Sequence, residues 1–167
     1  MSMRGVYIRL TPDEYARAAG DPGWAEEFAD GLRAAEPDVE RPPPTARVHR
    51  TDRAWHGLDF LLRRRGFPVD VIHGEEPIPG AGDRGSGPPG LLSPERVRAA
   101  ADAFAVLGPA ELSAGVTPAD LAAAEIHPAS WWADPYAVEL LTGHYVPLAA
   151  FFRATALRGH ALVMWID

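Results

Sequence analysis

Residues 52–62 have the sequence DRAWHGLDFLL and predict the central helix of the fold. We expect this helix to begin near Asp52 and to end at Gly66, with Pro68 beyond it. The side chains within about 100° of arc form its core face: Ala54, Trp55, Leu58, Leu61 and Leu62. His56 and Phe60 lie at i and i+4 on the opposite face. Because a helix that is apolar on two sides is usually covered on two sides, we place it at the centre and Trp55 in the core.

The two ends of the chain predict strands of one sheet. Val6, Ile8 and Leu10 alternate with Tyr7 and Arg9, which is typical of a strand with one solvent-exposed face. Residues 161–166, ALVMWI, are continuously apolar and predict a strand buried on both faces near the middle of a sheet. Weaker strand candidates lie at 46–50 and 69–72. Since strand candidates are few, we expect the first and the last strand to pair.

Most of the remaining chain predicts helices. Helix starts, each a capping residue followed by proline, occur at Thr11, Asp21, Ser93 and Thr117. We expect Trp24, Phe28 and Leu32 to form the buried stripe of the second helix. A long helical region begins at Asp134 and ends at Gly159, and Pro147 should kink or split it.

These elements predict one α+β domain over residues 1–167, in which helices pack around a small sheet that contains both terminal strands. Residues 74–90 are rich in Gly and Pro and predict a flexible loop. A chain of 167 residues buries roughly 70% of its unfolded surface, which suffices for a core.

The composition excludes several classes of chemistry. The chain has no Lys and no Cys, and all 16 cationic residues are Arg. It therefore lacks Schiff-base lysines, P-loop lysines, thiolate nucleophiles and disulfides. A net charge of −7 argues against nucleic acid and anionic membranes as partners. No apolar run approaches the ~20 residues of a membrane span, so we expect a soluble cytoplasmic protein, either a monomer or a weak homodimer.

No cofactor or metal site is expected. Residues 80–85, GAGDRG, match the dinucleotide pattern G-x-G-x-x-G, but prolines flank them where a strand and a helix are required. His73, Glu75 and Glu76 offer metal ligands from one loop, yet a Gly/Pro-rich loop favours a solvated arrangement over a rigid site.

The best catalytic pair is His56 with Asp59, at i and i+3. Asp59 also lies four residues before Arg63, the usual spacing of a helical ion pair. The pair is therefore either structural or part of a pocket in which His56 acts as a general base. For binding, Trp131 and Trp132 are the main candidates, together with Phe60. Two adjacent tryptophans cannot both point inward from a turn, and exposed Trp is enriched at interfaces.

Several segments resemble the YfbM-like family, small bacterial proteins grouped as a domain of unknown function. The likeness lies in residues 3–7, 55–62, 92–97, 124–128 and 156–162, which have the family's order and spacing. The resemblance implies a compact α+β domain in the bacterial cytoplasm and no established activity. Where the family often has a second histidine, this chain has Asp59.

Two functions remain open. The first is a non-catalytic binding or protein-interaction module, whose acidic charge would suit a basic partner in the manner of immunity or inhibitor proteins. The alternative is a hydrolase-like enzyme built on His56 with Asp59, Glu75 and Glu76. Convergence of these residues, or of Glu125 with His56, on the floor of one pocket would favour the enzyme.

Overall fold

The computed structural model describes residues 3–167, apart from the side chains of Trp131 and Trp132. Five strands form an antiparallel sheet in the order β2-β1-β5-β4-β3. β1 (Gly5–Leu10) pairs with β5 (Ala161–Ile166) along its whole length, from Gly5 opposite Ile166 to Leu10 opposite Ala161. The predicted pairing of the two chain ends is confirmed, and β5 is the central strand.

The other strands are β2 (Val48–Asp52), β3 (Glu76–Pro77) and β4 (Gly90–Leu92). The helices are α1 (Pro12–Gly20), α2 (Pro22–Ala35), α3 (Trp55–Arg64), α4 (Pro94–Val106), α5 (Pro109–Ser113), α6 (Pro118–Ala123), the 3-10 helix η1 (Ala129–Ala133) and α7 (Ala137–Leu157).

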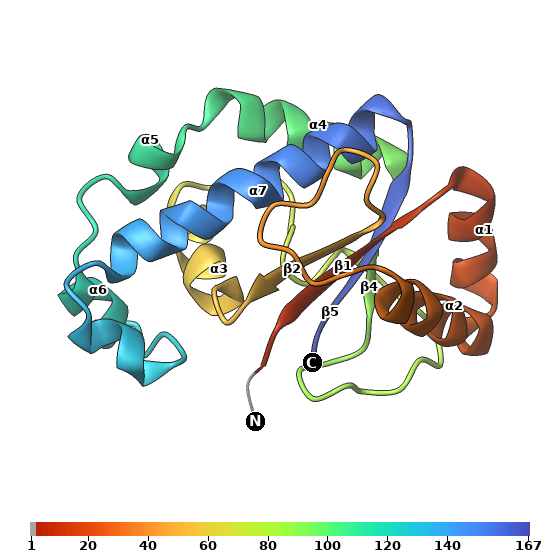
Figure 1. Cartoon of the computed structure of the whole chain (residues 1–167), viewed down its shortest axis with the longest axis horizontal. Coiled ribbons are helices and arrows are strands. Elements are labelled where there is room, and N and C mark those ends of the chain that lie inside the picture. Colours follow the sequence, from red (N-terminus) through yellow and green to blue (C-terminus); the bar gives the residue numbers. More distant parts are fainter. Residues whose placement is uncertain (1–2) are drawn as a thin grey trace.

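Helices cover both faces of the sheet (Figure 1). α1 and α2 pack on the face to which Val6, Ile8 and Leu10 point. The larger core lies on the other face, where α3, α4 and α7 cover Tyr7 and Leu162. Each fully buried Leu on this face contributes about 1.5–3 kcal/mol relative to exposure.

α3 is the predicted central helix, and its apolar face is buried as expected: Ala54, Trp55, Leu58, Leu61 and Leu62. It is shorter than predicted at its start, because Asp52 ends β2 with a positive φ of 48°. Gly57 allows α3 to approach α7 closely, since a Cβ at this position would lie 2.4 Å from Leu141. The same helix therefore contacts the core on one side and leaves His56 and Phe60 half-buried on the other.

Some sequence predictions were wrong. β1 has no solvent-exposed face, because α7 also covers Tyr7 and Arg9. Residues 69–72 form turns instead of a strand. The segment over residues 74–90 is mostly loop but contains β3 and the first residue of β4, and its flexibility stays a prediction.

The helix details also differ. In α2 the fully buried residues are Ala25 and Ala29, while the predicted stripe flanks them and is half-buried: Trp24, Phe28 and Leu32. α7 continues through Pro147 without splitting, since a 21-residue helix packed along α4 tolerates the loss of one hydrogen bond. Among the described residues, no helix has the length and apolar character that crossing a bilayer requires.

Candidate functional site

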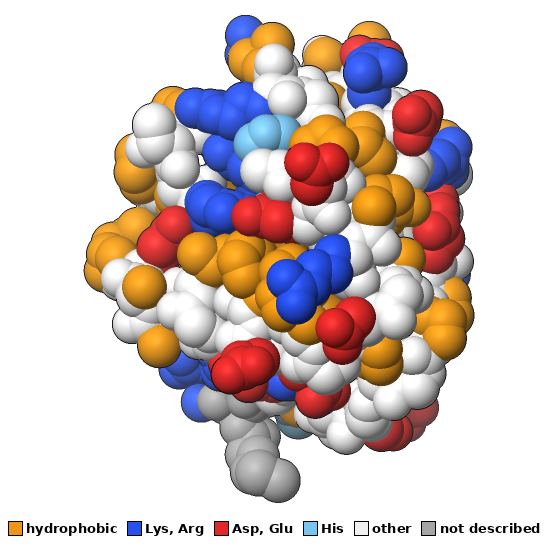
Figure 2. Space-filling model, turned by 90° about the vertical axis from the view of Figure 1, so that its right-hand side faces the viewer, with side chains coloured by type: hydrophobic (Ala, Val, Ile, Leu, Met, Phe, Trp, Pro, Cys, Tyr) orange, Lys and Arg blue, Asp and Glu red, His pale blue; other side chains and the backbone are white. Residues whose placement is uncertain are grey.

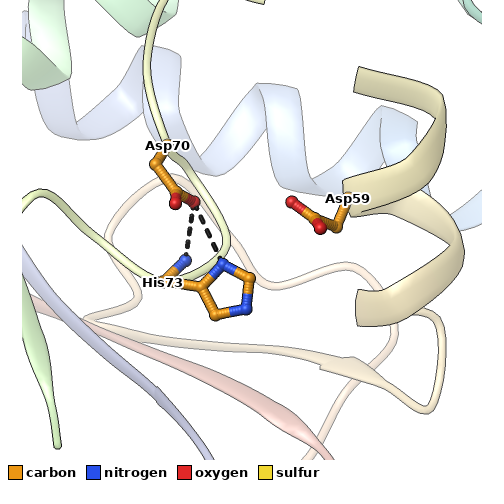
Figure 3. A group of neighbouring side chains, drawn as sticks. All are labelled: Asp59, Asp70 and His73. Atoms are coloured by element: carbon orange, nitrogen blue, oxygen red, sulfur yellow. Dashed lines mark hydrogen bonds and ion pairs between the residues drawn. The ribbon is translucent and has the colours of Figure 1, made fainter. Parts of the chain in front are cut away.

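Asp59, Asp70 and His73 converge beside the solvent-facing side of α3 (Figure 3). One donor atom from each residue lies within 4.8 Å of the other two. Asp59 comes from α3, and the other two come from the turn that follows this helix. The Asp59 carboxylate points across the gap toward His73 (Figure 3). The fold thus joins two carboxylates and an imidazole from separate local structures.

The turn that carries Asp70 and His73 is held by its own hydrogen bonds. The Asp70 carboxylate accepts hydrogen bonds from the backbone N–H groups of Ile72, at 3.1 Å, and His73, at 2.9 Å. It also lies 3.3 Å from the His73 Nδ1 atom. Gly90 fixes the turn against β4, because a Cβ there would lie 1.9 Å from the His73 carbonyl oxygen. The positions of Asp70 and His73 are therefore set by backbone packing.

Arg63 links the two carboxylates, and we call Asp59, Arg63, Asp70 and His73 the α3 cluster. The Arg63 Nε atom lies 2.8 and 2.9 Å from the two carboxylate oxygens of Asp59. Its Nη2 atom lies 3.5 Å from Asp70 Oδ2. The Arg63 side chain is 64% exposed, so its guanidinium holds both carboxylates from the solvent side.

Electrostatics within the α3 cluster favour an ionised Asp70 and a protonated His73. Burial alone would raise the pKa of Asp70, but the hydrogen bonds from His73 lower it below its usual value. The hydrogen bond to Asp70 raises the pKa of His73, although burial opposes this shift. His73 therefore acquires a proton more easily than an isolated histidine.

His56 has a different environment from His73. Its Nδ1 atom accepts a hydrogen bond of 3.0 Å from the backbone N–H of His127, and its ring stacks on Trp55 at 4.9 Å. Burial lowers the pKa of His56, although the charge of Asp59 opposes the shift. In the neutral ring the proton must therefore sit on Nε2, which makes this atom a hydrogen-bond donor.

An open groove of about 440 Å³ runs along the solvent-facing side of α3. We call it the α3 groove, and its lining residues are His56, Asp59, Phe60, Arg63, Arg64, Ala124 and Ile126. A smaller cavity of about 110 Å³ lies on the other side of Asp59, next to Phe67 and Asp70. Asp59 and Arg63 thus separate a groove from a cavity.

The other predicted site residues do not join this groove. Glu75 forms an ion pair with Arg96, with 2.6 Å between its Oε2 and the Arg96 Nε. Glu76 accepts a hydrogen bond of 2.9 Å from the Tyr15 hydroxyl on α1. The side chains of Trp131 and Trp132 lie outside the described residues. Of the predicted set, the structure brings together His56, Asp59 and Phe60 along one groove.

The sequence did not reveal Asp70 and His73 as partners of Asp59. Their signal was the spacing Asp-x-x-His at residues 70–73, which permits an Asp side chain to cap a turn. The sequence analysis placed Asp70 in a strand over residues 69–72 and His73 in the loop after it, so it gave no reason to pair the two side chains.

Comparison with known proteins identifies the family. A family model described as a domain of unknown function, DUF1877, matches residues 1–165. The chain belongs to this family. The fold is similar to that in the crystal structure of a protein of unknown function, YfbM from Escherichia coli, with a TM-score of 0.67. The two chains are 16% identical, and the match covers 98% of this chain and 99% of YfbM. No curated protein matches.

The family membership confirms the resemblance found in the sequence. At this level of identity the likeness to YfbM shows a common fold and carries no activity.

Proposed function

We propose that this DUF1877 protein is a non-catalytic binding module, and that the α3 groove binds a segment of a partner protein. The hydrogen bond from the His127 N–H to His56 Nδ1 carries the proposal. Because it occupies the basic nitrogen of the neutral ring, His56 offers a donor at Nε2 and no proton acceptor for general-base chemistry. A donor beside a half-buried aromatic ring suits recognition of a carbonyl or carboxylate group.

The composition of the α3 groove supports this use. Phe60 supplies apolar surface, and Ala124 and Ile126 line the groove with it. Interfaces commonly place an aromatic anchor next to a few directed polar groups. The net charge of −7 would speed association with a basic partner, as in immunity or inhibitor proteins.

The face formed by α1 and α2 is a poorer candidate for this interface. Figure 2 shows Arg, acidic and hydrophobic side chains interspersed over it. Its main aromatic pair, Trp24 and Phe28, stacks at 4.7 Å and is covered by arginines. Arg17 lies 4.4 Å from the Trp24 ring centre, and Arg47 lies 5.4 Å from that of Phe28. The Trp24 and Phe28 rings are therefore covered by arginines of the same chain, which leaves less aromatic surface for a partner.

The test begins with capture of a partner from the source cells and continues with the purified pair. Affinities are measured for the wild type, Phe60→Ala and His56→Ala, with Val106→Ala as the control. Val106 is 79% exposed on α4 and does not line the groove. We expect the two groove variants to weaken binding about tenfold or more, as at interface hot spots. The control should bind like the wild type, and equal affinities for all four proteins would reject the groove.

The hydrolase alternative is tested with a second set of variants. Wild type, His56→Gln and Asp59→Asn are assayed on model carboxylic and phosphoric esters. We expect no turnover above that of heat-denatured protein. If the wild type turns over an ester and His56→Gln does not, the protein is a hydrolase and the binding-module proposal is rejected.

A further inference from the structure

We infer that the α3 cluster is a site for a divalent metal ion of the Mn²⁺ or Zn²⁺ class, held by Asp59, Asp70 and His73, with Arg63 as its competitor. This inference revises the expectation of no metal site that the sequence supported. Asp59 and Arg63 also line the α3 groove, but metal binding is measured on the chain alone and needs no partner.

The first support for a metal site is the spacing of the three donor atoms. Metal–ligand bonds to carboxylate oxygen and imidazole nitrogen are about 2.0–2.2 Å long, so two ligands of one ion lie at most about 4.4 Å apart. The donor atoms already lie within 4.8 Å of one another. Small side-chain rotations therefore complete the site. Two oxygens and one nitrogen suit ions between the hard Mg²⁺ and the soft Cu⁺.

The position of Arg63 indicates that the site requires positive charge. Asp59 and the Oδ2 atom of Asp70 both face its guanidinium. The guanidinium is mostly exposed, and among the described residues it forms hydrogen bonds to the Asp59 carboxylate and none to backbone. It can therefore turn into solvent when a metal ion takes its place. Asp70 Oδ1 remains bonded to the His73 backbone, which keeps the site in position.

A buried polar atom on Trp55, next to His73 of the cluster, provides an independent observation. Tyr7 is 1% exposed and Trp55 is 8% exposed, so the Tyr7 hydroxyl and the Trp55 indole N–H are both buried. The Trp55 indole N–H makes no hydrogen bond among the described residues, whereas the Tyr7 and Thr51 hydroxyls interact with each other. Tyr7 is within electrostatic range of Asp70 and Asp59, and Trp55 packs edge-on against His73 at 6.3 Å. Buried polar groups without protein partners commonly adjoin ordered water or an ion.

The experiment is calorimetric titration of the untagged full chain with MnCl₂, repeated with ZnCl₂. Five proteins are compared: wild type, Asp59→Asn, His73→Asn, Arg63→Gln and the control Asp83→Asn. Asp83 is an exposed carboxylate that caps a loop by accepting hydrogen bonds from Gly85 and Gly87. Thermal melting accompanies each titration to show that the variant is folded.

We expect the wild type and Asp83→Asn to bind a single equivalent of metal with the same affinity. Asp59→Asn and His73→Asn should bind at least about tenfold more weakly, the scale of effect known for supporting groups at metal sites. Arg63→Gln should bind severalfold more tightly, a gain that misfolding cannot produce. The inference is overturned if wild type and Arg63→Gln show no saturable binding, if the ligand variants bind like the wild type, or if Arg63→Gln binds more weakly.

Discussion

Two polar clusters lie against the same face of the sheet, and they differ in exposure and in how their hydrogen bonds are used. The α3 cluster is open to solvent through Arg63. The second, which we call the buried cluster, consists of Arg9, His49 and Thr155 under α7, and each of them is at most 2% exposed. The comparison separates polar groups that hold the fold from polar groups that are available to a ligand.

The buried cluster is closed by contacts within the chain. Arg9 Nε donates to the Thr155 hydroxyl at 3.0 Å, and its Nη1 donates to the Pro44 carbonyl at 2.9 Å. The Arg9 guanidinium also lies 5.0 Å from the Phe151 ring centre. Burial, together with the charges of Arg158 and Arg47, lowers the pKa of Arg9 to about 10, so the group stays charged at neutral pH. The Arg9 Nη2 atom has no hydrogen-bond partner among the described residues.

His49 and His73 illustrate the same difference. His49 stacks on Phe151 at 5.4 Å, and neither of its ring nitrogens has a hydrogen-bond partner among the described residues. Burial lowers its pKa to about 4. His73 has a carboxylate partner, which raises its pKa. One histidine is therefore kept neutral as part of the core, and the other binds a proton more readily than an isolated histidine.

Deleting residues 160–167 should have the largest effect, because β5 pairs with both β1 and β4. Without it, the strand that carries Arg9 loses one of its two neighbours, and the buried cluster loses its support. We expect urea unfolding followed by circular dichroism to lose its cooperative transition. A sharp transition in the truncated chain would contradict this role for β5.

Trp55→Ala should cost roughly 3–5 kcal/mol of unfolding free energy, the usual range for a buried aromatic residue. Trp55 lies between the core and the α3 cluster, where its ring contacts His56 and His73. Urea unfolding measures the cost. A loss of unfolding free energy below about 1 kcal/mol would mean that Trp55 does not anchor the α3 cluster to the core.

The buried cluster should make stability depend on pH. The unfolded His49 binds a proton near pH 6.5, whereas the folded one stays neutral down to about 4. Between these values the unfolded state binds more protons, so stability falls as the pH falls. The full effect is about 3 kcal/mol. Unfolding free energies of wild type and His49→Phe at several pH values isolate this contribution, and parallel curves would show that His49 is not responsible.

The α3 cluster should contribute least to stability. Asp59→Asn and Arg63→Gln break an ion pair whose Arg63 side chain is 64% exposed, and pairs open to solvent on one side are worth less than about 1 kcal/mol. Urea unfolding at neutral pH provides the measurement. A loss of several kcal/mol in either variant would make the α3 cluster structural, like the buried cluster.

Much of the fold was predictable from the sequence because its signals are local. The period of residues 54–62 predicted the buried face of α3, and the apolar run at 161–166 predicted the central strand. Tyr7 and Arg9 were misjudged because alternation cannot show that α7 returns over their side of β1. β3 and β4 are too short for any periodic signal.

The site was only half predictable. His56, Asp59 and Phe60 share one helix, so their spacing in the sequence already predicted that they lie close together. Asp70 and His73 reach Asp59 only because the chain turns back after α3 and is fixed against Gly90. That return depends on side-chain capping and close backbone packing, which apolar patterns do not encode.

The central claim is that the α3 groove binds a partner while the buried cluster supports the fold. Hydrogen–deuterium exchange of the full chain, with and without the captured partner, tests it most directly. We expect added protection over residues 55–65 and 123–128, and unchanged exchange in α1 and α2. Protection confined to α1 and α2, or to the exposed sides of α4 and α7, would contradict the assignment of the groove.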